Sequence, residues 1–304
     1  MHFSVWPSFE RPWTEVLDVA QRAEAAGWHG LWYADHFMTD TPDGAPSDAP
    51  VLECWAALAG LAASVPRLRL GSLVSPTTVH HPAVLAKRAC TVDHISDGRL
   101  VLGIGAGWQV NEHRAYGIEL YPPGERVGRF VEAIEILRGL LDQERTTKAG
   151  DHFSVIDAPC QPKALQQPLP IMVGASGPRM LRATARFADE WNTWGDLPQA
   201  AQRSAVFEDA CEAVGRDPDT MRRSVQAMLF VTEDQAATDK LRERVPAGRC
   251  LVGSVPEIVD AMGRYAAMGF DEFIVPDFNL GASAEARWEA FERIREGVVA
   301  QVSA

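Results

Sequence analysis

The sequence predicts an α/β fold, a (β/α)₈ TIM barrel that forms one domain over residues 1–304. Short apolar runs rich in β-branched and aromatic residues alternate with longer amphipathic segments along the whole chain, which is typical of βα units around a parallel sheet. Eight such runs suit a closed barrel. We expect the strands at 2–6, 29–34, 68–74, 100–105, 169–174, 188–193, 224–231 and 271–276.

Several amphipathic segments begin near a proline and end at a glycine, as helices often do. We expect helices from Trp13 to Ala26, Pro82 to Ile95, Arg126 to Leu141 and Pro256 to Met268. Four stretches do not fit the simple repeat: 38–50, 106–125 after the fourth strand, 144–168 after the fourth helix, and 232–252. We expect those that follow strands as insertions at the C-terminal face of the barrel. Because the third contains a turn-like KAGD followed by HFSVIDAP, it predicts a small hairpin.

Composition narrows the class of function. No run of about 18 apolar residues could cross a bilayer, so we expect a soluble chain without a membrane partner. The net charge of -12 argues against nucleic acid and favours a small-molecule substrate. The five cysteines are widely spaced and show no metal-ligand spacing, so we expect buried thiols and no metal. The first residues lack the pattern of a secretory signal, and we therefore expect a cytoplasmic protein.

Chemistry in a TIM barrel gathers at the carboxyl ends of the strands. The second strand ends in Ala34-Asp35-His36-Phe37. Asp35 could accept hydrogen bonds from a ligand, and His36 could move a proton near neutral pH. An ordinary Asp-His pair in a solvent-facing loop is the alternative.

Glycine-rich segments follow other strands. After the fourth strand, the chain from Gly103 to His113 contains small residues that would let a flat ring approach the backbone, and Asn111 could bind a polar chain. The spacing fits neither a dinucleotide fingerprint nor an ATP phosphate loop, and tight turns remain the alternative. After the fifth strand, Gly174 to Arg179 could bind phosphate at a helix start, unless Ser176 only caps that helix.

Aromatic residues gather at the same predicted strand ends. Tryptophan is usually a core residue, but several near one rim predict a broad apolar pocket. The predicted pocket residues are Trp6, Phe37, Trp108, Trp191 and Trp194.

Taken together, these segments resemble the luciferase-like monooxygenase superfamily, and most closely its coenzyme F420-dependent oxidoreductases. The resemblance covers almost the whole chain. It is carried by GLWYADHF (30–37), residues 68–108 ending in GIGAGW, NEHRAYGI (111–118), PPGER (122–126), PLPIMVGASGPR (168–179) and GFDEFIV (269–275).

The resemblance implies a role for each matching residue. Asp35 would contact the cofactor, and His36 would lie close to its reactive ring and act as the catalytic residue. Ser72-Leu73 would form a bulge with a cis peptide bond behind the ring. The remaining cofactor contacts would come from Ala106, Gly107 and Asn111 at the ring edge and side chain, and from Gly174, Ala175, Ser176 and Gly177 at the phosphate.

One position departs from the family pattern. Trp108 stands where the sugar-phosphate and alcohol dehydrogenases of the family carry an acid, so these two activities are not expected. The leading hypothesis is hydride transfer between C5 of F420 and a small, hydrophobic organic substrate. One alternative is an FMN-dependent monooxygenase supplied by a separate cofactor reductase. Another is a barrel that binds a flavin without turnover, with Trp108 filling the substrate space. The resemblance also implies a homodimer.

Overall fold

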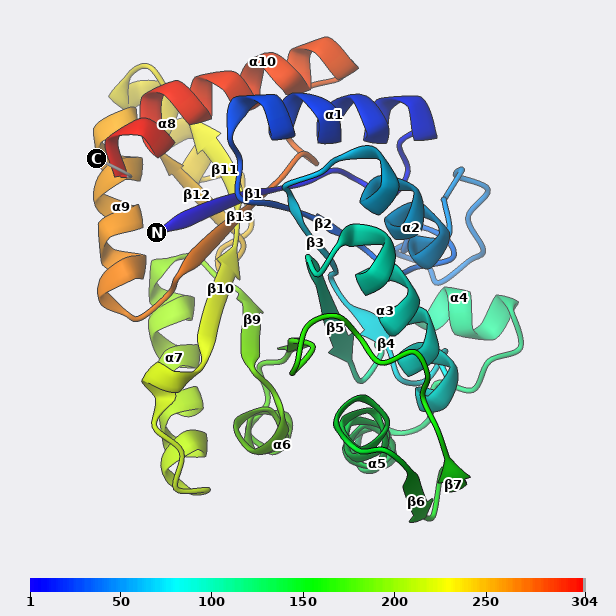
Figure 1. The fold of residues 1–304 in the computed structure, drawn as a ribbon. Helices are drawn as coiled ribbons and strands as arrows, with labels where there is room; N and C mark the ends of the chain where they lie inside the picture. The colour runs from blue at the N-terminus through cyan, green and yellow to red at the C-terminus, as the bar shows by residue number, and fades with distance from the viewer. Residues whose placement is uncertain (303–304) are drawn as a thin grey trace.

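The computed structural model describes residues 1–302, and these form a closed barrel of eight parallel strands surrounded by helices (Figure 1). Closure is shown by two pairings: β1 lies beside β13, and β3 lies beside β5. The predicted fold class is therefore confirmed. Around the ring, the strands are β1 (His2–Trp6), β2 (Gly30–Tyr33), β3 (Arg69–Ser72), β5 (Leu100–Gly105), β8 (Ile171–Gly174), β9 (Glu190–Trp194), β10 (Arg222–Gln226) and β13 (Glu272–Pro276).

Helices cover the outside of the barrel and connect consecutive strands. Each predicted helix is present with its ends shifted by three residues or fewer. Gly27 ends the first one in a left-handed conformation (φ 78°), which glycine adopts at little cost. The main helices are α1 (Trp13–Ala26), α2 (Cys54–Ser64), α3 (Pro82–Ser96), α5 (Pro123–Asp142), α6 (Pro178–Phe187), α7 (Leu197–Glu212), α9 (Val255–Ala267) and α10 (Ala284–Ile294).

Shorter elements occupy the segments between the main units. β6 and β7 form the predicted antiparallel hairpin. The predicted strand at 224–231 is wrong in one respect, because it divides: β10 ends at Gln226, and the chain then leaves the barrel to pair with β12. The short elements are β4 (Ser75–Pro76), α4 (Val110–Ala115), β6 (Thr146–Ala149), β7 (Ser154–Ala158), η1 (Pro218–Thr220), β11 (Met228–Val231), α8 (Gln235–Arg242), β12 (Cys250–Gly253), η2 (Arg295–Val299) and α11 (Ala300–Val302).

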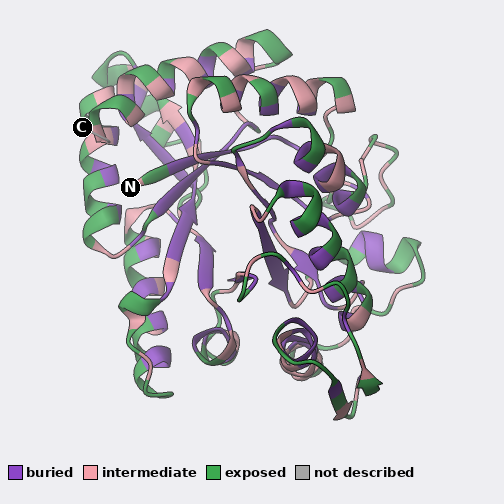
Figure 2. Ribbon diagram, viewed as in Figure 1, coloured by how far each residue is buried: buried purple, intermediate pink, exposed green. Residues whose placement is uncertain are grey.

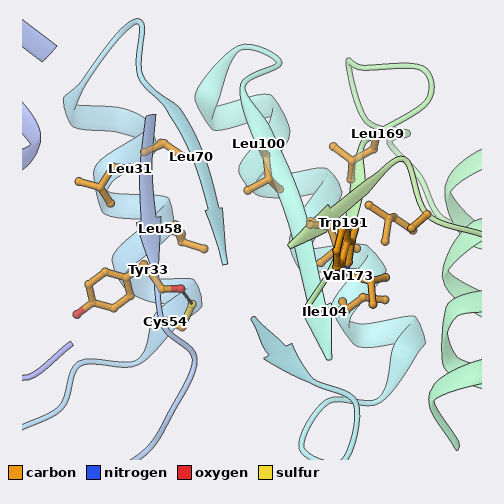
Figure 3. Close-up of a cluster of buried hydrophobic side chains, with 14 of the residues drawn as sticks. Leu31, Tyr33, Cys54, Leu58, Leu70, Leu100, Ile104, Leu169, Val173 and Trp191 are labelled. Atoms are coloured by element: carbon orange, nitrogen blue, oxygen red, sulfur yellow. Dashed lines mark hydrogen bonds between the residues drawn. The ribbon is translucent and has the colours of Figure 1, made fainter. Parts of the chain in front are cut away.

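The apolar core has two parts. A large outer part lies between the strands and the helices, and Figure 3 shows some of it, including Leu31, Leu100 and Val173. Figure 2 shows the buried strands enclosed by helices whose outer faces are exposed. A small inner part fills the barrel with Trp6, Trp32, Ala34, Leu73, Val101, Met172 and Ile274. All five cysteines are free and buried, as predicted. Within residues 1–302, no helix combines the length and apolar character that crossing a membrane requires.

A network of charged side chains closes the lower end of the barrel. Glu272 is fully buried, and both Ser4 and Trp32 donate hydrogen bonds to its Oε1 atom. The guanidinium groups of Arg69 and Arg222 lie beside its Oε2 atom. Arg222 also donates a hydrogen bond to Nε2 of His29, at 2.7 Å, which requires that this nitrogen carry no proton.

This last contact predicts a pH dependence of stability. Burial, together with the neighbouring Arg222, lowers the pKa of His29 to about 4, although Glu272 acts in the opposite direction. An unfolded histidine titrates near 6.5, so the unfolded state takes up the proton first as the pH falls. We expect the free energy of unfolding to decrease between about pH 6.5 and 4. His29→Gln should flatten this slope in urea titrations, with His94→Gln, on an exposed face of α3, as the control. An unchanged slope would contradict the assignment to His29.

Candidate functional site

The predicted site lies at the barrel mouth, where the strands end. There His36 and Glu112 form a hydrogen-bonded pair, with 2.9 Å between His36 Nδ1 and Glu112 Oε1. The second carboxylate oxygen, Oε2, accepts a hydrogen bond from the backbone N–H of Phe37 at 2.8 Å. The Glu112 side chain is 2% exposed and that of His36 is 15% exposed. Because an ionised carboxylate only accepts, the pair fixes a proton on Nδ1 and leaves Nε2 for a ligand.

Glu112 was not predicted as a site residue from the sequence. Although Trp108 removes the acid expected directly after the glycine turn, a carboxylate reaches His36 from α4, four residues later. The segment NEHRAYGI contained this residue, but its sequence position alone did not indicate that it would contact residue 36. The mouth therefore does carry an acidic neighbour for the histidine.

Aromatic rings surround this pair. The imidazole of His36 meets the edge of Trp108 with 5.6 Å between ring centroids, and Phe9 lies 5.5 Å away on another side. Phe37 packs against Tyr116 at 5.2 Å. Trp108 is 57% exposed, so it stands on the rim and does not fill the barrel. This position does not support the hypothesis that Trp108 fills the substrate space and prevents turnover.

Asp35 is buried at the end of β2, where its carboxylate is held by two polar side chains. Ser75 and His80 both donate to its Oδ2 atom, with 2.8 Å to His80 Nε2. Trp55 in turn donates to the Ser75 hydroxyl at 3.1 Å. Burial alone would raise the pKa of Asp35, but His80 and Ser75 outweigh it and hold the pKa below its ordinary value. Asp35 is thus kept as an anion next to the mouth.

The bulge after β3 lies one residue later than predicted. The cis peptide bond joins Leu73 and Val74, so the prediction of a cis bond at Ser72-Leu73 is wrong. Strand pairing continues through Ser72, which lies opposite Tyr33, and its hydroxyl bonds both the N–H and the carbonyl of Gly103 inside the barrel. These bonds explain why the chain departs from the strand only after Ser72. Ser72 is fully buried, and Leu73 belongs to the inner core.

Val74 lies at the position in the mouth that was predicted for Ser72 and Leu73. Its side chain is partly exposed and lies between Gly105 and Gly174. A Cβ atom on Gly105 would come within 2.7 Å of the valine, and one on Gly174 within 3.1 Å. The two glycines therefore leave room for a flat apolar surface across the ends of three neighbouring strands. That surface fits the face of a planar ring.

Asn111 is buried, and the structure uses all of its hydrogen-bonding groups within the protein. Its Nδ2 atom donates to the carbonyls of Thr39 and Ala45, and its Oδ1 atom accepts from Gln109 and from the Glu112 backbone. The residue thus anchors the 38–50 loop and the start of α4. A direct contact between Asn111 and a cofactor stays a prediction.

The other predicted contacts line the opposite side of the mouth. Ala106 and Gly107 are partly exposed after β5, and Gly107 has φ 83°. Gly174 and Ala175 are also partly exposed, whereas Ser176 and Gly177 are exposed just before α6. Gly177 is the N-cap residue of that helix and has no side-chain cap, so the Ser176 capping alternative is wrong. The free N–H groups of a helix start favour an anion here.

The predicted tryptophans divide between two environments. Trp6 belongs to the inner core and packs against Trp194, with 5.5 Å between ring centroids. Both are the last residues of their strands, so they line the barrel interior at the mouth. Trp191 is wrongly predicted as a pocket residue. It is fully buried and stacks on Phe207 of α7 at 4.4 Å (Figure 3 shows it in the outer core). Successive strand residues point to opposite faces, and Asn192 and Trp194 take the inner one.

A separate cavity of about 820 Å³ lies between β11, α8 and α10. Its lining includes Phe230, Leu241 and Ile294, and none of the predicted site residues. The mouth remains the place where the polar and aromatic groups converge.

Comparisons with known proteins identify the family of this chain. The model of the luciferase-like monooxygenase family matches residues 1–246. An F420-dependent glucose-6-phosphate dehydrogenase of Kineococcus radiotolerans is 33% identical over 228 residues, which are 73% of this chain and 65% of that protein. The chain thus matches just under two thirds of that relative. An F420-dependent glucose-6-phosphate dehydrogenase of Microbacterium testaceum is 30% identical over 300 residues, covering 86% and 87% of the two chains.

The fold has a close match among solved structures. An F420-dependent secondary alcohol dehydrogenase, in complex with an F420-acetone adduct, aligns with a TM-score of 0.82 over 98% of both chains. Their sequence identity is 19%, so this likeness concerns the fold. The family model spans most of the sequence, and the chain belongs to the luciferase-like monooxygenase family.

Proposed function

We propose that this protein is an F420-dependent oxidoreductase that transfers a hydride between the deazaflavin and a small apolar organic substrate. The observation that carries the proposal is the His36–Glu112 pair, which lies at the same end of the barrel as the flat surface formed by Val74, Gly105 and Gly174. Two relatives with 30% identity or more are named F420-dependent dehydrogenases, which supports the same cofactor.

The residues at the mouth fit such a cofactor. Val74 and the glycines beside it offer a face for the tricyclic ring, and the buried Asp35 offers an anionic acceptor close by. Ala106 and Gly107 would lie along the side chain, with Gly174 to Gly177 at its phosphate. When bound, F420 supplies the hydride acceptor or donor at C5. The protein orients the ring and excludes water from the reacting atoms.

His36 is the residue that we assign to proton transfer. Glu112 holds Nδ1 and so orients the ring, while Nε2 makes no hydrogen bond within residues 1–302. This nitrogen can give a proton to the substrate as the substrate accepts the hydride, or take one in the reverse direction. Glu112 stabilises the imidazolium form in either direction, and it is a positioning residue because it acts through His36.

Aromatic side chains indicate the substrate class. Trp108 stands on the rim beside His36, and Trp6 and Trp194 pack together where β1 and β9 end at the mouth. Large rings contribute apolar contact area and few charges, so we propose that the substrate is small and mainly apolar.

Side-by-side titrations test the proposed function. We expect saturable quenching of F420 fluorescence, and weaker binding of FMN. Reduced F420 should then be oxidised in the presence of electron-poor olefins or ketones, without oxygen uptake. Tighter binding of reduced FMN together with oxygen uptake would support a monooxygenase instead. If neither F420 nor FMN binds saturably, the proposed function is wrong.

A further inference from the structure

Two of the five buried cysteines touch each other in the outer part of the core. Cys90 lies on α3, and Cys160 lies in the segment that follows β7. Their sulfur atoms are 3.7 Å apart, so one thiol can donate a weak hydrogen bond to the other. No other two cysteines within residues 1–302 form such a bond. Two thiols in contact, 70 positions apart in the sequence, can react with each other, which a single buried thiol cannot.

Cys160 lies just beneath the surface, although its own side chain is buried. The residues on both sides of it are exposed, and the chain from 159 to 168 forms no helix or strand. Figure 1 shows this stretch running beside α3 on its way from β7 to β8. A stretch without helix or strand opens locally more readily than the core elements do, so a molecule little larger than water can reach the sulfur.

The surroundings of Cys160 favour its thiolate. Lys87, on α3, donates to the carbonyl of the residue that follows Cys160, and Lys163 lies three positions along the chain. The hydrogen bond from the Cys90 thiol, together with Lys163 and Lys87, lowers the pKa of Cys160, although burial acts in the opposite direction. The same hydrogen bond, together with burial, raises the pKa of Cys90. The two thiols are therefore unequal: Cys160 is the nucleophile of the pair and Cys90 is the proton donor.

The other three cysteines provide the contrast. Burial raises the pKa of Cys54, Cys211 and Cys250. The thiol of Cys54 also donates to the carbonyl of Tyr33, with 3.7 Å between sulfur and oxygen. Because the thiolate is the form that attacks an oxidant, these three are poor nucleophiles. Cys160 alone among the five combines a lowered pKa with a second thiol in contact.

We propose that Cys90 and Cys160 form a peroxide-sensitive modification site, at which Cys160 is oxidised first and Cys90 then closes a disulfide. The oxidant is hydrogen peroxide, which is small and takes two electrons. The Cys160 thiolate attacks one oxygen, so an S–O bond forms and the O–O bond breaks; the departing hydroxide takes up the proton that Cys160 lost and becomes water. This inference does not depend on the proposed function.

The second step is made by Cys90. Its sulfur attacks the sulfenic sulfur of Cys160, so the S–S bond forms as the S–O bond breaks, and the hydroxide leaves as water with the proton of Cys90. Two thiols have then lost two electrons, and one peroxide has become two waters. A dithiol reductant reverses the modification by thiol–disulfide exchange.

Peptide mapping by mass spectrometry tests the site, after brief exposure of the folded full chain to hydrogen peroxide. We expect a cross-linked pair of peptides that contains Cys90 and Cys160, weighs two hydrogens less than the two reduced peptides, and disappears with a dithiol reductant. The other three cysteines should stay reduced. If both thiols survive a dose that already oxidises methionine side chains, the inference is overturned. A sulfinic acid on Cys160 without the cross-link overturns it as well.

Serine variants separate the two roles. Cys90→Ser should stop at a sulfenic acid on Cys160, which dimedone traps, whereas Cys160→Ser should leave Cys90 reduced. Cys250→Ser is the matched control and should form the cross-link at the rate of the unmodified protein. Equal dimedone labelling of Cys90 and Cys160 in the two single variants would contradict the proposed order of attack.

A lysine variant tests the activation of Cys160 without touching either thiol. Lys87 is exposed, so Lys87→Gln should fold normally and lower the rate of cross-linking at neutral pH by roughly threefold, the modest effect of one exposed charge. Lys87→Arg should restore the rate, and Lys240→Gln on α8 is the exposed control. Equal rates in Lys87→Gln and Lys240→Gln would contradict the activation. None of these measurements requires a cofactor, so failure of the proposed function leaves them unaffected.

Discussion

His36→Ala is expected to lower kcat by roughly 10² to 10⁴-fold while leaving the F420 dissociation constant nearly unchanged, because the residue is assigned to proton transfer and not to ring binding. This loss corresponds to about 3 to 5 kcal/mol of transition-state stabilisation. Glu112→Gln should lower kcat by about 10²-fold with little change in KM, since the neutral amide cannot stabilise an imidazolium. Both effects are measured as the rate at which the visible absorbance of F420 recovers while an electron-poor olefin oxidises the reduced cofactor.

The matched control for Glu112 is Glu119→Gln, which removes an exposed carboxylate from the same insertion. Glu112→Asp should recover part of the rate, because it restores the charge near His36. Equal kcat values for Glu112→Gln and the unmodified protein would contradict the positioning role. A large rise in KM, with kcat unchanged, would instead assign Glu112 to substrate binding.

The sequence predicts the fold well, because the evidence for it is local. The alternation of strand and helix patterns needs no knowledge of distant contacts, and each of the eight strands lies at or within a few residues of its predicted place. The division of 224–231 into two strands, by contrast, depends on a distant contact. Whether the chain continues in the barrel or pairs with β12 depends on the partner strand, whose residues lie 22 positions later.

The site was less predictable, because its geometry depends on contacts between distant segments. Glu112 and His36 are 76 positions apart, and only the folded barrel brings α4 over the end of β2. Trp191 illustrates a second limit. A buried strand is apolar on both faces, so the pattern does not reveal which residues face inward, and an error of one position moves a side chain from the pocket to the outer core. The one-residue error at Ser72 has a different origin, because the hydrogen bonds that keep Ser72 in the strand are made to Gly103, 31 positions away.

The charged network at the lower end of the barrel is expected to contribute to the stability of the fold, whereas the residues at the mouth carry the chemistry. Burial disfavours the charged form of Glu272, but Arg69 and Arg222, with help from Ser4 and Trp32, hold its pKa below the ordinary value. Burial raises the pKa of Glu190, which pairs with Arg69 at the same end. Glu272 is therefore the anion around which the two arginines are arranged.

Glu272→Ala is accordingly expected to reduce the free energy of unfolding by about 3 to 5 kcal/mol, because it leaves two partly buried guanidinium groups without their shared anion. Urea denaturation at neutral pH measures the loss, and Glu289→Ala on the exposed face of α10 should change it by less than about 0.5 kcal/mol. A double-mutant cycle with Arg222→Ala should give a coupling energy above about 1 kcal/mol. At a temperature well below its midpoint, Glu272→Ala should still bind F420 with unchanged Kd, because the network lies at the opposite end from the mouth. A loss below 1 kcal/mol would contradict the stabilising role of Glu272. A changed Kd in the folded variant would show that the lower end of the barrel is coupled to the mouth.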